Sequence, residues 1–168
     1  MNMTVHIPES TVVDLIGLDE LQKQAPRVAA RHWTAQRGLH RIPSRGDINL
    51  RKIAGELRHI TLIKVLDGDF QYSIVGDANV RAYSTPLQNR RLSEVARQAP
   101  KFASTLHMLF ARVANTGEPL ALRKFIGRDF AQANFTDFES ALLPLALDHE
   151  TVDHILAANA YTMRHYRY

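Results

Sequence analysis

The sequence predicts an α+β fold: a five-stranded antiparallel sheet with helices on one face, plus a helical extension at the N-terminus. Two observations predict it. The pair Asp67-Gly68 lies between two β-rich runs and favours a tight hairpin turn with positive φ. The β-rich runs also form two blocks around a helical middle, an order typical of an antiparallel sheet packed against helices. We expect strands near residues 60–66, 70–76, 119–127, 137–147 and 152–161.

Length and composition are those of one folded domain. The chain has 168 residues, of which 45% are hydrophobic and 23% charged, so one core accommodates it. We expect residues 1–38 as the helical extension and residues 39–168 as the domain proper. The absence of cysteine excludes disulfides, thiolate nucleophiles and iron–sulfur clusters. No signal-peptide pattern and no run of about 18 apolar residues occurs, so we expect a cytoplasmic protein without membrane contact.

Apolar residues recur at three- and four-residue steps over residues 19–37, the period of an amphipathic helix. Gly38 can end this helix. Pro26 removes a backbone hydrogen bond inside a helix, so we expect a kink or a fresh start near Ala25. The preceding residues 10–17 are expected as a short separate helix.

The middle of the chain combines irregular and helical segments. Residues 40–47 favour a loop and residues 50–57 a short helix. Residues 77–92 are expected to be irregular, with one or two helical turns. A long helix then restarts at Pro100 and stops at Gly117.

Several stretches in this order resemble the PAS fold, and in particular a bacterial family of small, stand-alone PAS-like proteins. The resemblance spans Trp33 to Leu156, about three quarters of the chain. In place of the glycines of the family's Tyr-Gly and Thr-Gly pairs, this chain has Ser84 and Asn89, and asparagine tolerates the left-handed region. The matching stretches after Trp33 are IPSRGDI at 42–48, LIKVLD at 62–67, FQYSIVG at 70–76, RLSE at 91–94, GEP at 117–119, ESALLPL at 139–145 and VDHIL at 152–156.

The resemblance implies a sensory or adaptor role in signal transduction and not an enzyme. PAS domains bind small molecules between sheet and helices, or bind proteins through the outer sheet face and flanking helices. We expect action through a signalling partner, possible binding of a small molecule, and no cofactor. A stand-alone small-molecule-binding sensor is an alternative. The pocket candidates, which simple core packing would also explain, are Tyr72, Ile74, Tyr83, Phe102, Leu106, Phe110 and Leu122.

Motifs for catalysis or metal binding are missing from the sequence. There is no nucleophile elbow, no phosphate-binding glycine loop and no HExxH pair among the eight histidines. Glu139 and Asp153 could act as general acids, but surface or structural roles are the simpler interpretation. His107 lies where some haem-binding PAS domains carry their iron ligand, yet a surface histidine on an amphipathic helix explains it equally. We expect no metal.

Positive charge is concentrated in one segment. The net charge is +4, whereas residues 27–58 hold eight basic and two acidic residues, a balance of +6. A nucleic-acid-associated regulator using this segment is a further alternative. Few stacking aromatics accompany the charges, so a solvated face is the simpler interpretation and nucleic acid is not the expected partner.

The apolar face of the N-terminal helix must be covered. We expect a homodimer in which this helix packs against the sheet or against its copy, because exposed apolar faces usually mark interfaces. A helix that folds back on its own sheet in a monomer is the competing arrangement. The interface candidates are Leu21, Val28, Ala29 and Trp33.

Overall fold

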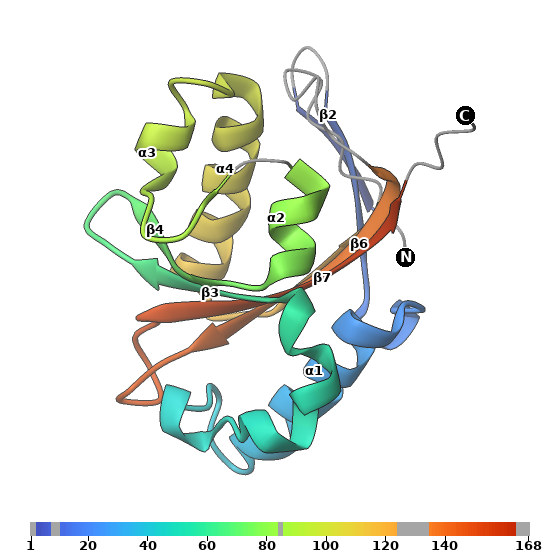
Figure 1. Cartoon of the computed structure of the whole chain (residues 1–168). Helices are drawn as coiled ribbons and strands as arrows, with labels where there is room; N and C mark the ends of the chain where they lie inside the picture. The colour runs from blue at the N-terminus through green and yellow to red at the C-terminus, as the bar shows by residue number, and fades with distance from the viewer. Residues whose placement is uncertain (1–2, 8–10, 84–85, 124–134, 164–168) are drawn as a thin grey trace.

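The computed structural model describes residues 3–7, 11–83, 86–123 and 135–163, and confirms an α+β protein with an antiparallel open sheet (Figure 1). The strand order is β1-β2-β5-β6-β7-β3-β4. The expected strands are all present, except that residues 124–127 of the third lie outside the described residues. The strands are β1 (Met3–Ile7), β2 (Thr11–Ile16), β3 (Ile60–Val65), β4 (Phe70–Val75), β5 (Leu120–Arg123), β6 (Phe135–Leu145) and β7 (His154–Met163).

Tight turns set the register of the two hairpins. In the turn between β3 and β4, Gly68 adopts a φ of +68°, as the sequence predicts, and the Leu66 N–H donates to the Asp69 carbonyl at 2.9 Å. Between β6 and β7, His149 takes a positive φ of 63°. The Asp148 carboxylate stabilises that turn by accepting the backbone N–H groups of Glu150 and Thr151.

The N-terminal segment adds β1 and β2 to the sheet, so the described sheet has seven strands and the expected number of five is wrong. The short helix expected over residues 10–17 is wrong, because β2 occupies this region and pairs with both β1 and β5. Val13 and Leu15 are buried on one face of the sheet while Asp14 lies between them, a two-residue period. Among its described residues, the expected helical extension over residues 1–38 is therefore helical only from Leu18 onward.

The long helices begin and end where proline and glycine allow. Pro26 lies in the first turn of α1, where a backbone N–H has no hydrogen-bond acceptor within the helix, so proline is tolerated there. Pro100 is the first residue of α4. Gly38 and Gly117 follow the two helices with positive φ. The one or two helical turns expected within residues 77–92 are present as α2, and the short helix α3 begins at the end of this region. The helices are η1 (Leu18–Glu20), α1 (Gln24–Arg37), η2 (Arg45–Asp47), η3 (Leu50–His59), α2 (Asp77–Tyr83), α3 (Leu92–Val95) and α4 (Pro100–Thr116).

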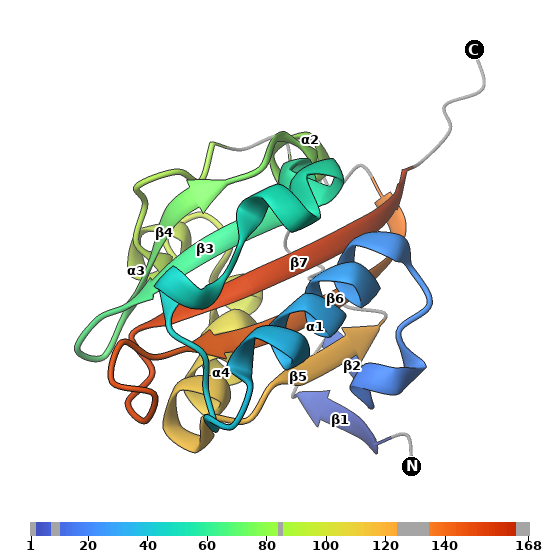
Figure 2. The ribbon, with the colours of Figure 1, turned by 90° about the horizontal axis from the view of Figure 1, so that it is seen from below.

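Helices cover both faces of the sheet, so the expectation of helices on one face is wrong. α2, α3 and α4 lie on one side and α1 with η3 on the other (Figure 1). Seen from below, α1 crosses the sheet over β6 and β7 (Figure 2). Alternating residues therefore build two cores. On β6, Phe138 and Leu142 face α4, whereas Ala141 and Leu143 face α1.

Length and hydropathy decide whether a helix can cross a bilayer. Within the described ranges, no helix is long and apolar enough to do so.

Candidate functional site

A small cavity lies between the sheet and helices α2 and α4. Its volume is about 50 Å³, room for about one or two water molecules or a ligand of few atoms. Six of the seven pocket candidates line it: Tyr72, Tyr83, Phe102, Leu106, Phe110 and Leu122. The described lining also includes Thr61, Ile63, Asn79, Leu87, Leu109, Phe138, Ser140, Leu142, Ala157, Asn159 and Tyr161.

Ile74 does not line the cavity, and its prediction is wrong. Strict alternation from Tyr72 places Ile74 on the same face, but the β3–β4 register shifts between Leu62 and Ile63. Tyr72 pairs with Ile63, whereas Ile74 pairs with Leu62, which packs in the core on the α1 side. The extra residue, Ser73, thus turns Ile74 to the opposite face, where 48% of it is exposed.

One end of the cavity is polar, a feature that the sequence analysis missed. Asn79 of α2 accepts two hydrogen bonds at its Oδ1, from Asn159 Nδ2 at 2.9 Å and from the Tyr161 hydroxyl at 2.8 Å. Asn159 Oδ1 accepts from Ser140 Oγ at 2.5 Å. Ser140 and Asn159 are opposite each other on β6 and β7. The four side chains therefore form a connected network between sheet and helix. The available signal was the placement of Asn159 and Tyr161 in step with Ile155 and Ala157, at inward positions of β7.

Three tyrosines around the cavity are held in the neutral form. Burial raises the pKa of Tyr72, Tyr83 and Tyr161. The Tyr83 ring packs against Phe102 at 5.0 Å and edge-on against Tyr161 at 5.8 Å between centroids. Protonated phenols can both donate and accept hydrogen bonds, so the three tyrosines give the aromatic wall polar positions.

His107 lies outside the cavity. Its side chain is on the exposed face of α4, where the ring packs edge-on against Phe70 and Nε2 is 3.4 Å from the Gly68 carbonyl. Among the described residues, no group of three or more histidine, aspartate and glutamate side chains is arranged to hold a metal ion.

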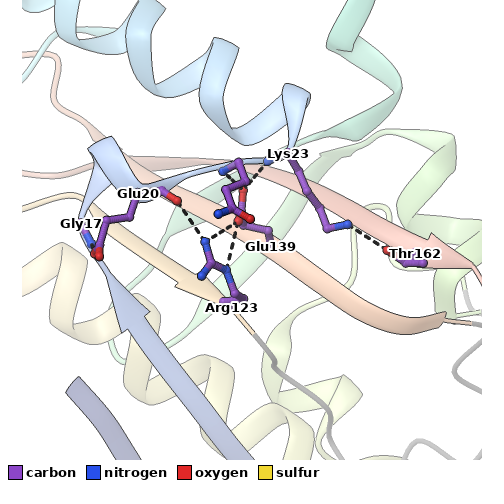
Figure 3. A network of polar contacts seen from close by, with 7 residues as sticks. Gly17, Glu20, Lys23, Arg123, Glu139 and Thr162 are labelled. Carbon is purple, nitrogen blue, oxygen red and sulfur yellow. Dashed lines mark hydrogen bonds and ion pairs between the residues drawn. The ribbon is translucent and has the colours of Figure 1, made fainter. Parts of the chain in front are cut away.

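Glu139 has a structural position on the other face of the sheet (Figure 3). It is 1% exposed, and its Oε1 accepts the backbone N–H groups of Gln22 and Lys23 at 2.8 and 2.7 Å, at the start of α1. Its Oε2 forms an ion pair with Arg123 at 3.1 Å. Arg123 also donates to the Glu20 carbonyl. Glu139 thus anchors the beginning of α1 to β5 and β6, where its charge favours the helix N-terminus.

The interface candidates pack against the sheet of their own chain. Leu21, Ala29 and Trp33 are buried in the core between α1 and the sheet, and Val28 is half-buried. Trp33 Nε1 donates to the Pro144 carbonyl at 2.7 Å. Of the two arrangements considered for this helix, packing on its own sheet is the one observed.

The basic segment is exposed around α1 and η3. Arg58 pairs with Asp77, and Arg41 donates to the Thr116 carbonyl. The other six basic side chains of the segment have no carboxylate partner in the described part of the chain: Arg27, Arg31, Arg37, Arg45, Arg51 and Lys52.

Comparisons with protein-family models, with curated proteins and with solved structures give no significant match to this chain.

Proposed function

We propose that this chain is a PAS-like sensory or adaptor module that holds a small molecule in the cavity and acts through a protein partner. The observation that carries the proposal is the cavity itself, which lies between sheet and helices and has an aromatic wall and one polar end. Concave, mostly apolar sites with a few placed polar groups are typical of small-molecule binding.

The proposal includes a non-enzymatic role. The described lining carries no aspartate, glutamate, histidine, lysine or arginine, so it offers no ordinary acid–base pair. Its tyrosines have raised pKa values because of burial and stay protonated. These groups are suited to hold a ligand and not to transfer its protons.

A route from the cavity to α1 follows from strand alternation. Ser140 lines the cavity, while the preceding residue on β6, Glu139, binds the start of α1. On β5, Leu122 lines the cavity and Arg123 pairs with Glu139. A ligand that shifts these strands therefore acts on the anchor of α1. In this proposal α1 is the element that reports occupancy of the cavity.

A second surface is suited to protein contact. Leu39 and Leu147 are almost completely exposed, on loops that adjoin because the His40 and His149 rings stack at 3.7 Å. Since the interface candidates on α1 are buried, we assign the expected homodimer contact to this pair of loops. Light scattering of a variant that carries both Leu39→Ser and Leu147→Ser tests the assignment.

Mass spectrometry tests the ligand-binding role. The full chain is purified natively, denatured, and the released small molecules are compared with those from an Ala157→Val variant, in which two added methyl groups occupy the cavity. We expect a molecule that wild type releases and the variant does not. Identical release from both proteins would contradict the proposal.

Nucleic-acid regulation is the second candidate function, favoured by the unpaired basic side chains around α1. Phosphate contacts of this kind weaken steeply with salt. A gel-shift titration with duplex DNA and with RNA between about 50 and 200 mM salt tests it. This candidate would be supported if the wild-type chain binds nucleic acid and the double variant Arg27→Ala, Arg31→Ala does not.

A further inference from the structure

Two residues that line the cavity have hydroxyl groups that the protein does not use. Thr61 on β3 and Tyr72 on β4 are 2% and 6% exposed and both line the cavity. Neither Thr61 Oγ1 nor the Tyr72 hydroxyl has a hydrogen-bond partner in the described structure. Among the described residues, the side-chain polar atom that is both fully buried and without a partner is His59 Nδ1, so the hydroxyls of Thr61 and Tyr72 are reached from the cavity space. A hydroxyl inside a folded protein is usually paired with protein, water or ligand, and here a molecule in the cavity can complete the hydrogen bonding.

The neighbouring polar network does not satisfy them. Asn79 Oδ1 already accepts from Asn159 and Tyr161, and Asn159 Oδ1 already accepts from Ser140. These bonds connect the network internally, and none of them involves Thr61 or Tyr72.

The charge and size of the site limit what fits. Burial of an ion without a counter-charge is costly, and the described lining carries no charged side chain. The volume of about 50 Å³ is far below the ~300 Å³ at which drug-sized pockets begin. Phe102, Leu106 and Phe110 supply an apolar wall from α4.

We infer that the cavity selects an uncharged molecule of only a few non-hydrogen atoms, such as a short-chain alcohol or ketone. Its oxygen bonds to Thr61 Oγ1 and the Tyr72 hydroxyl, and its alkyl part packs on the α4 wall. The inference rests on the proposed function and adds the chemical class of the ligand.

The test uses matched probes on the full chain, followed by NMR chemical shifts of the cavity residues. The neutral probes are 2-propanol and acetone, the charged ones isopropylammonium and acetate, and xenon serves as an apolar probe. We expect saturable shifts with 2-propanol and acetone and none with the charged probes. Thr61→Val and Tyr72→Phe should each weaken 2-propanol binding about three- to tenfold, the value of one hydrogen bond, and leave xenon binding unchanged. Thr34→Val, on the exposed side of α1, should change neither the binding of 2-propanol nor the binding of xenon.

The outcomes separate this inference from the proposed function. Equal binding of neutral and charged probes, or binding of xenon without the alcohol and ketone, would overturn the inference and leave the cavity as a ligand site. If no probe, xenon included, perturbs the cavity residues, both the inference and the ligand-binding role are wrong.

Discussion

Filling the cavity should stabilise the protein while removing its binding site. Ala157 is 3% exposed at the centre of the sheet, between Thr61 of β3 and Leu142 of β6, and it lines the cavity. Ala157→Val adds two methyl groups to this space. At about 0.8 kcal/mol for each buried carbon, the free energy of unfolding should rise by about 1.6 kcal/mol. For a chain of this length that corresponds to about 3–6 °C in Tm. Valine also suits a strand.

The neighbouring Ala158 provides the control. It is fully buried on the opposite face, in the core beneath α1, and does not line the cavity. Ala158→Val overpacks a filled core and should lower the free energy of unfolding by about 1–3 kcal/mol. Urea unfolding measures the free energy of unfolding of both variants, and a 2-propanol titration measures ligand binding. If Ala157→Val destabilises the protein as much as Ala158→Val does, or binds 2-propanol like wild type, the assignment of the cavity is refuted.

Three further predictions concern the other face and the assembly. Glu139→Gln leaves Arg123 without its ion-pair partner and should lower the free energy of unfolding by about 3 kcal/mol in urea titrations, with partial recovery when Arg123→Met is added. Burial lowers the pKa of His32, whose Nε2 accepts the Asn49 N–H, so this histidine favours folding in its neutral form. The contribution of His32 to the free energy of unfolding should be complete above pH 6.5 and decline as the pH falls below that value. Denaturation at pH 5 and pH 7.5 measures this decline, which a His32→Gln variant should lack. The homodimer stays a prediction: light scattering should give twice the chain mass for wild type and the single mass for the loop variant with both leucines replaced by serine, and a monomeric wild type would contradict it.

Local patterns were sufficient for much of the fold. The Asp67-Gly68 turn predicts the β3–β4 hairpin, and Pro100 and Gly117 mark the two ends of α4. The side-chain period of α4 also places Phe102, Leu106 and Phe110 on the cavity side. These features depend on residues close together in sequence, where turn chemistry and periodicity act directly.

The features that were missed depend on distant segments. Whether residues 11–16 form a strand is decided by pairing with β5, more than a hundred positions away. The position of Ile74 depends on the irregular register between β3 and β4. The Asn79–Asn159 hydrogen bond joins residues 80 positions apart. No local pattern contains the register that brings such groups together.

Hydrogen exchange tests the central claim, that occupancy of the cavity is transmitted across the sheet to α1. The amides of Gln22 and Lys23 donate to Glu139 on the face opposite the cavity, and the Leu66 amide, in the β3–β4 turn, serves as a reference. Exchange is followed by NMR with and without xenon, for wild type and for Ala157→Val. We predict that xenon changes the exchange of Gln22 and Lys23 in wild type, leaves Leu66 unchanged, and has no effect in the variant. A response confined to the cavity residues, or one that persists in Ala157→Val, would contradict the account.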